Sequence, residues 1–139
     1  MKPLFLTTTI ILAICLAGCS NTNPQGRIPV SGEVTLNGKP VQEGNIEFTT
    51  VKGATPSVMT GAAIKNGKFE TDAPNGLIPG QTYTVKIAAL EEVAGEFSIT
   101  PTGDKTPLKK DVTPPQWSNQ SKETITVEKN KPAIFNFKM

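Results

Sequence analysis

The sequence predicts an all-β domain, and in particular a Greek-key β-sandwich of about seven strands. Apolar and polar residues alternate over several short segments between residues 30 and 139. This period of two is typical of strands with one buried face. Turn-forming pairs such as Asn-Gly separate the segments, and no segment keeps a helical period over ten residues. Short alternating segments with frequent turn signals favour a sandwich over other architectures.

The first predicted hairpin lies between residues 30 and 49. Its first strand covers residues 30–36, and the second strand covers residues 41–49. The connecting pair Asn37-Gly38 tolerates the positive φ of a two-residue turn. Gly44 interrupts the second strand and predicts a bulge there. The inward positions of the two strands are Val30, Gly32, Val34, Leu36, Ile46 and Phe48.

A second set of strands follows up to residue 90. Residues 58–64 form the next predicted strand, and Asn66-Gly67 turns the chain so that Phe69 points inward. The segment 72–80 is rich in turn residues and predicts a connection. Residues 81–90 then alternate cleanly and predict a central strand. Its inward residues are Tyr83, Val85, Ile87 and Ala89.

The remaining third of the chain has a weaker pattern. Residues 91–100 are ambiguous and fit a short edge strand through Phe97 and Ile99. Residues 101–121 are polar, contain four prolines and predict a long loop, which is usually functional or disordered. Two last strands are expected at residues 123–129 and 133–139. Their inward residues are Ile125, Val127, Phe135, Phe137 and Met139.

Two local features are expected from residue chemistry. The glycines at turns should take positive φ, which a residue without Cβ adopts without strain. These glycines are Gly38, Gly67 and Gly76. The ring of Tyr83 should be buried, with its hydroxyl in a hydrogen bond at the margin of the sandwich.

The first residues carry a second kind of signal. Lys2 precedes a mostly apolar run over residues 4–17, which is shorter than the roughly 20 residues of a membrane-spanning helix. The run ends in Leu16-Ala17-Gly18-Cys19. This motif resembles the lipobox of bacterial lipoproteins at all four positions. The resemblance implies cleavage between Gly18 and Cys19, a diacylglycerol thioether on Cys19, and often a further acyl chain such as palmitate. An ordinary secretory signal and an uncleaved anchor are the alternatives.

These features predict three parts of the chain. Residues 1–18 are a lipoprotein signal peptide, residues 19–28 are the lipidated Cys and a flexible tether, and residues 29–139 are the β-sandwich domain. Cys15 leaves with the signal peptide and Cys19 carries lipid, so the mature chain has no disulfide. The expected location is the cell envelope, on the exported face of a membrane. The lipid on Cys19 provides the contact with that membrane.

Composition argues against several classes of function. The sequence has 14 basic and 12 acidic residues without a cationic cluster, which disfavours a nucleic-acid partner. Its densest basic site, Lys109-Lys110, is expected in a solvated loop. Histidine is absent, which removes the most common general base and the usual zinc ligand. The sequence therefore predicts no catalytic residue, no cofactor and no metal site.

The order of the motifs resembles bacterial lipoproteins with a carboxypeptidase-regulatory-like, transthyretin-like domain. The resemblance covers residues 30–139, although an extra residue separates Gly80 from Tyr83, and Trp117 stands where the family has tyrosine. It implies a seven-stranded prealbumin-like sandwich and no enzymatic activity. The fold-defining positions that it implies are Gly32, Gly38, Pro40, Gly44, Phe48, Gly67, Phe69, Gly80, Tyr83, Val85 and Ile87.

The predicted function is that of a non-catalytic envelope lipoprotein with a structural or protein-interaction role, whose partner is an envelope protein or glycan. The alternative is a carbohydrate- or peptide-binding module in which an exposed Trp117 stacks on the ligand. Trp117 can equally fill the edge of the sandwich. A calcium site at Glu91, Glu92 and Glu96 is a weaker hypothesis, because a charged edge explains these residues as well. A hydrolase of the transthyretin-like fold would require active-site histidines.

Overall fold

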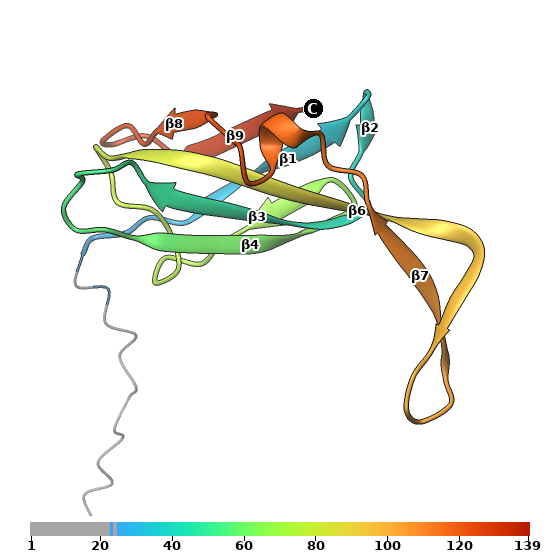
Figure 1. The fold of residues 1–139 in the computed structure, drawn as a ribbon. Helices are drawn as coiled ribbons and strands as arrows, with labels where there is room; N and C mark the ends of the chain where they lie inside the picture. Colours follow the sequence, from blue (N-terminus) through green and yellow to red (C-terminus); the bar gives the residue numbers. More distant parts are fainter. Residues whose placement is uncertain (1–22, 24) are drawn as a thin grey trace, which may run out of the picture.

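The computed structural model describes Asn23 and residues 25–139. Gly18 and Cys19, and with them the predicted signal peptide and half of the predicted tether, lie outside the described residues. Nine strands and one 3-10 turn follow one another in this described part of the chain (Figure 1). They are β1 (Val30–Leu36), β2 (Lys39–Pro40), β3 (Glu43–Thr50), β4 (Met59–Lys65), β5 (Lys68–Glu70), β6 (Thr82–Ile99), β7 (Lys105–Asp111), η1 (Pro115–Trp117), β8 (Thr124–Thr126) and β9 (Ala133–Lys138).

The strands form one curled sheet that is antiparallel apart from a single parallel pair. Strand β1 has β9 on one edge, in parallel, and β2 and β5 on the other. Strand β3 lies between β4 and β6, and the far edge of β6 pairs with both β8 and β7. The prediction of an all-β domain is confirmed. The described residues form nine strands and not the predicted seven or so, because the structure adds the two-residue β2 and also β7, which lies within the predicted loop.

The hydrophobic core lies inside the curl of the sheet. Alternate residues of β1, β3 and β6 point into it, which is what the period of two predicts. A row of rings crosses this core, from Phe48 on β3 through Phe69 on β5 to Phe137 on β9, with centroids about 6 Å apart. The largest fully buried side chains are Tyr83, Phe48, Ile46, Ile64, Leu77, Ile87, Val30, Val34, Val85 and Val127.

Both Asn-Gly turns form, but the predicted pairing of residues 30–36 with residues 41–49 was wrong. The first turn joins β1 to β2, and β3 pairs with β4 and β6. In the first, Asn37 and Gly38 have φ of 51° and 78°, and in the second, Asn66 and Gly67 have φ of 50° and 77°. Positive φ at both central positions defines the type I′ hairpin turn, whose twist matches that of the strands. Each turn therefore fixes the register of the strands that flank it.

The predicted roles of Gly44 and Gly76 were wrong. Strand β3 keeps its register through Gly44 with both β4 and β6, so no bulge occurs there. A Cβ at Gly44 would lie 2.1 Å from the carbonyl oxygen of Ala88. Gly76 is not among the residues with positive φ, and a Cβ there would lie 1.9 Å from the carbonyl oxygen of Ile28. Both glycines are needed for close approach of two backbones.

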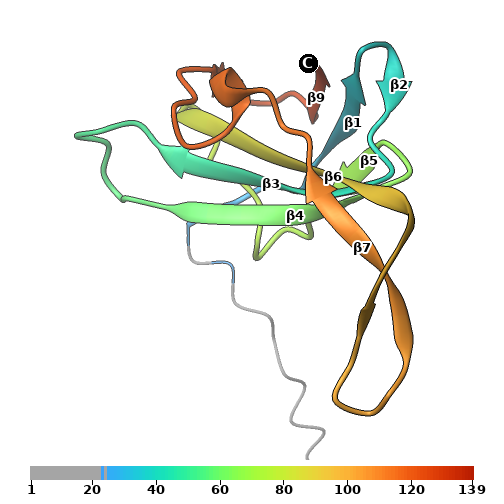
Figure 2. The same ribbon diagram turned by 45° about the vertical axis from the view of Figure 1, so that its right-hand side comes forward.

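The largest departure from the sequence prediction is an arm, which we define as residues 91–111. The segment 91–99 is the far half of β6 and not a separate edge strand. The predicted loop 101–121 contains β7, which pairs with β6, and η1. The register shifts between Glu92 and Phe97, where Gly95 has φ of 78°. Figures 1 and 2 show the arm bending away from the rest of the sheet.

Candidate functional site

Trp117 is the one predicted binding residue that the structure describes. It closes the 3-10 turn η1, which Pro115 begins, and its backbone N–H donates to the carbonyl of Pro114. The ring is half-buried and meets the ring of Phe137 edge-on, with centroids 5.8 Å apart and planes at 77°. Edge-to-face contact is a favourable arrangement for two aromatic rings. Trp117 thus extends the row of core rings to the margin of the sheet.

Tyr83 has the buried environment that the sequence predicts. Its side chain is fully buried, and its hydroxyl oxygen accepts a hydrogen bond of 2.9 Å from the backbone N–H of Ile78. Burial raises the pKa of Tyr83, and the Ile78 hydrogen bond and the charge of Arg27 oppose this effect only in part. The hydroxyl therefore holds the 72–80 connection against β6 and is not exposed for chemistry.

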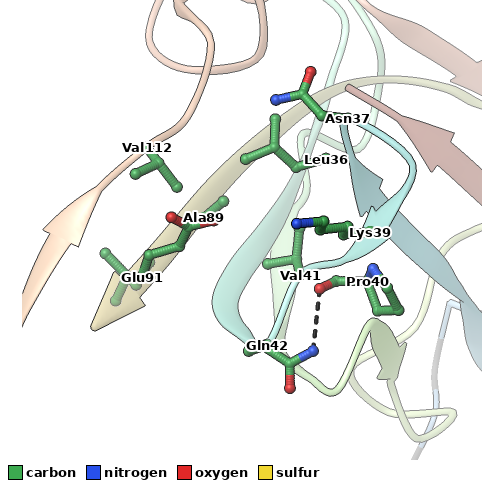
Figure 3. A pocket seen from close by; sticks show the side chains of 10 residues that line it. Leu36, Asn37, Lys39, Pro40, Val41, Gln42, Ala89, Glu91 and Val112 are labelled. Atoms are coloured by element: carbon green, nitrogen blue, oxygen red, sulfur yellow. Dashed lines mark hydrogen bonds between the residues drawn. The ribbon is translucent and has the colours of Figure 1, made fainter. Parts of the chain in front are cut away.

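A cleft of about 170 Å³ opens where the β1–β2 turn approaches β6 (Figure 3). Leu36, Val41, Ala89 and Val112 supply apolar walls, while the side chains of Lys39 and Glu91 lie at its margins. Gln42 donates its side-chain amide to the carbonyl of Pro40, 3.2 Å away, on the same rim. The cleft has the size of one amino-acid side chain and is shaped by residues from three separate strands.

A larger groove of about 530 Å³ lies beside this cleft, at the base of the arm. Both share Gln42, Leu90 and Glu91, so they form one continuous depression. Lys109 crosses the groove from β7 and contacts both carboxylate oxygens of Glu43 at 2.6 Å. The two side chains are 37% and 50% exposed, which limits the strength of the ion pair.

The arm itself is exposed to an unusual degree. All residues of β7 are exposed, as are those of β6 between Glu91 and Ile99 apart from Val93. Phe97 is 59% exposed and Ile99 72% exposed. A hairpin of two strands alone is only marginally stable in water. Phe97 and Ile99 thus expose apolar surface that the core does not cover.

Charged residues on the arm are arranged by strand. The far half of β6 carries Glu91, Glu92 and Glu96, while β7 carries Lys105, Lys109 and Lys110. No group of three or more metal-ligating side chains occurs in the described part of the chain, so the three glutamates do not converge on one point. Hydrogen bonds from Thr113 lower the pKa of Asp111 at the end of β7. The remaining acidic groups are at the protein surface.

Sequence reasoning missed the arm and the depression at its base. Solvent covers both faces of the arm, so its residues do not alternate in polarity. The sequence therefore predicts only an ambiguous edge strand at residues 91–100 and a loop from residue 101 onward. The available signal was the pair of basic and acidic segments, 105–110 and 91–96, which are complementary across a hairpin. No helix in the described residues is long and apolar enough to cross a membrane.

Comparison with known proteins does not assign a family. No protein-family model and no curated protein matches the chain. One similar solved structure is a 9R-lipoxygenase from Cyanothece PCC8801, with 13% identity and a TM-score of 0.36. The match covers 97% of this chain and 18% of that protein. A similarity at this level supports no conclusion about activity.

Proposed function

We propose that the protein is an exported lipoprotein, anchored to a membrane of the cell envelope through lipid on Cys19. The domain is non-catalytic and has a structural or protein-interaction role. The observation that carries this proposal is the motif Leu16-Ala17-Gly18-Cys19 at the end of an apolar run. A thiolate is the nucleophile needed to form a thioether with diacylglycerol.

The energetics of lipid anchoring support the proposal. Each buried methylene contributes about 0.8 kcal/mol, so a single acyl chain binds reversibly and two or three chains hold the protein stably. The tether after Cys19 ends at Ile28, whose backbone pairs with Leu77. Only eight residues lie between Cys19 and Ile28, and a fully extended chain of this length reaches at most about 30 Å. The domain would therefore lie close to the membrane surface.

We further propose that the domain is a Greek-key sandwich of the transthyretin-like type. The curled sheet supports this, since β9 and β1 form one side of the curl and β3 and β6 the other (Figure 2). Gly32 adds support because its lack of a side chain lets β1 approach β9. A Cβ there would lie 1.7 Å from the carbonyl oxygen of Phe135. The buried positions of Phe48, Phe69 and Tyr83 are consistent with the same fold.

Substitution of the two cysteines tests the anchor. Cys19→Ser removes the thiol, and Cys15→Ser is the matched control because Cys15 lies within the predicted signal peptide. The wild type and Cys15→Ser should incorporate labelled palmitate and partition into detergent. Cys19→Ser should do neither. Equal membrane partition of both variants would contradict the proposal and would favour an uncleaved apolar anchor.

The ligand-binding alternative has less support, because the Trp117 ring is half-buried and already packs against Phe137. Trp117 is the single tryptophan of the chain, so its fluorescence reports on this position alone. A buried-type emission maximum that does not move with added oligosaccharide is expected. A solvent-type maximum that shifts to shorter wavelength on adding sugar would instead support a stacking platform.

A further inference from the structure

Within the arm, the edge of β6 that faces away from β7 has no neighbouring strand among the described residues. Strand β3 pairs with β6 only as far as Glu43 opposite Leu90. Beyond that point, residues 91–99 pair with β7 on one side, and no described strand pairs with them on the other. Figure 2 shows this part of β6 extending past the end of β3. We call the unpaired side of residues 91–99 the β6 lane. Exposed strand edges of this kind pair readily with another chain.

Hydrogen bonds show which backbone groups point into the β6 lane. The carbonyl of Ala89 accepts a hydrogen bond from the N–H of Val112, on the β7 side of β6. Backbone groups of successive residues point to opposite edges of a strand, so Glu91 also faces β7, and the N–H and carbonyl of Glu92 point away from β7. At the tip, Thr100 donates to the carbonyl of Asp104. The pairs Phe97–Pro107 and Ile99–Lys105 are therefore the non-hydrogen-bonded pairs, and the backbone groups of Phe97 and Ile99 also point into the lane.

The opposite edge of the arm is less suited to pairing. By the same alternation, Pro107 lies where β7 would present its N–H outward, and proline has none. Lys105 and Lys109 flank it on the same strand. Proline and lysine on an edge strand are features that prevent unwanted pairing. The β6 lane has no proline and is bordered by the exposed side chains of Phe97 and Ile99.

Charge indicates what the β6 lane would bind. It carries Glu91, Glu92 and Glu96 without a basic residue between positions 91 and 99. Within the described residues, none of these three carboxylates has a cation within 4.0 Å, whereas Glu43 is held by Lys109. The lane also begins at the groove in which Glu91 and Glu92 lie beside the Lys109–Glu43 ion pair. A partner rich in Lys or Arg would complement this surface.

We propose that the β6 lane binds an extended, cationic peptide segment of a protein partner by strand addition. The segment lies antiparallel or parallel to residues 91–99 and starts in the groove at the base of the arm. It hydrogen-bonds to the lane-facing backbone of Glu92, Phe97 and Ile99, while its basic side chains meet the three free glutamates. The proposal rests on the interaction role proposed above and not on lipidation.

The probe is an end-capped peptide of about eight alternating lysine and valine residues, long enough to form one strand. It is added to the full chain isolated in detergent micelles, and binding is followed by fluorescence anisotropy. The same peptide with glutamate in place of lysine is the control. The lysine peptide should bind, more weakly at high salt, and should slow hydrogen exchange in residues 91–99. Equal binding of both peptides, or no protection of these residues, overturns the proposal.

Variants at the cross-strand pair Ile99–Lys105 test the two edges of the arm separately. Ile99→Pro removes a lane-facing N–H, and Ile99→Thr alters the side chain while keeping that donor. Ile99→Pro should bind about three- to tenfold more weakly than Ile99→Thr, the effect of one lost hydrogen bond. Lys105→Pro removes the opposite, outward N–H and should retain binding. Equal losses in the two proline variants overturn the proposal, because they indicate a general effect on the hairpin.

Charge reversal tests the partner's chemistry. Glu91→Lys with Glu92→Lys should weaken binding of the lysine peptide at least about tenfold, since both charges then repel it. Glu33→Lys with Glu70→Lys makes the same change on β1 and β5 and should leave binding intact. Self-association of the chain or binding to anionic vesicles that Ile99→Pro abolishes would assign the β6 lane to another occupant and overturn the proposal. Because peptide binding is measured apart from palmitate incorporation, the outcome is independent of the anchor test.

Discussion

The two halves of β6 are one continuous strand in two different environments. In residues 82–90, β3 covers one edge and β8 part of the other, and every second side chain is buried. In residues 91–99, β7 covers one edge only and no side chain is buried. Alternation of polarity thus arises where a strand has one dry and one wet face. The first half supports the fold, and the second half is available for an interaction.

The same substitution in the two regions should have very different effects. Phe48→Ala removes a fully buried ring that stacks near Phe69, and its loss should lower the free energy of unfolding by about 3–5 kcal/mol. Phe97→Ala removes a ring that is 59% exposed and should change the free energy of unfolding by about 0.5 kcal/mol or less. Urea unfolding of both variants measures the difference. Similar losses would mean that the arm packs on the core in solution.

Gly32 in the core and Gly95 in the arm show the same difference between the two regions in their backbone. Gly32→Ala forces a Cβ to 1.7 Å from the Phe135 carbonyl oxygen and 2.9 Å from the Phe69 ring, so β1 and β9 must separate. A loss of about 3 kcal/mol is expected. At Gly95 a Cβ meets nothing within 4 Å, but φ is 78°. Gly95→Ala should therefore cost only the strain of about 1–2 kcal/mol. Thermal unfolding of both variants checks this order.

Tyr83 gives a pH-dependent test within the first half of β6. Tyr83→Phe leaves the N–H of Ile78 without its acceptor and should lower the free energy of unfolding by about 1–2 kcal/mol. In the wild type, burial raises the pKa of this hydroxyl above its ordinary value of 10.0. The neutral form is thus favoured by folding. Its contribution is complete below pH 10.0 and is lost as the pH rises through the folded-state pKa.

Absorbance of tyrosinate measures this effect directly, because the chain has a single tyrosine. Ionisation should occur at higher pH in the folded protein than in urea. Tyr83→Phe should show a weaker decline of stability in alkaline solution. A folded-state pKa equal to that of the unfolded chain would show that water reaches the hydroxyl.

Sequence reasoning succeeded where local chemistry and burial agree. The alternation in residues 81–90 and the Asn37-Gly38 pair each determine structure through contacts within a few residues. The prediction of a bulge at Gly44 was wrong because the role of this glycine depends on the nearby backbone of Ala88, which no local pattern reveals. The arm was not predicted because polar and apolar residues do not alternate in a strand that has solvent on both faces. The groove was not predicted either, because its walls come from β3, β6 and β7, and the sequence does not indicate β7.

For the candidate site, the sequence supplied the chemistry but little of the geometry. Trp117 was expected either to fill an edge or to face solvent, and its contact with Phe137 follows from the path of η1. The glutamates at positions 91, 92 and 96 were recognised as charged edge residues. That they lie along an unpaired backbone edge depends on where β3 ends, which a single sequence does not indicate.

The ion pair between Lys109 and Glu43 connects the two regions and should have the smallest effect on stability. Both side chains are partly exposed, so Lys109→Met should lower the free energy of unfolding by less than about 1 kcal/mol. The local stability of the arm should fall more than that of the whole domain, because this ion pair joins β7 to β3. Hydrogen exchange in residues 105–111 should accelerate in Lys109→Met while exchange in residues 82–90 is unchanged. Lys110→Met is the matched control, since Lys110 lies opposite Glu91 without an ion pair within 4.0 Å in the described residues. If both variants accelerate exchange equally, net charge and not this contact holds the arm in place.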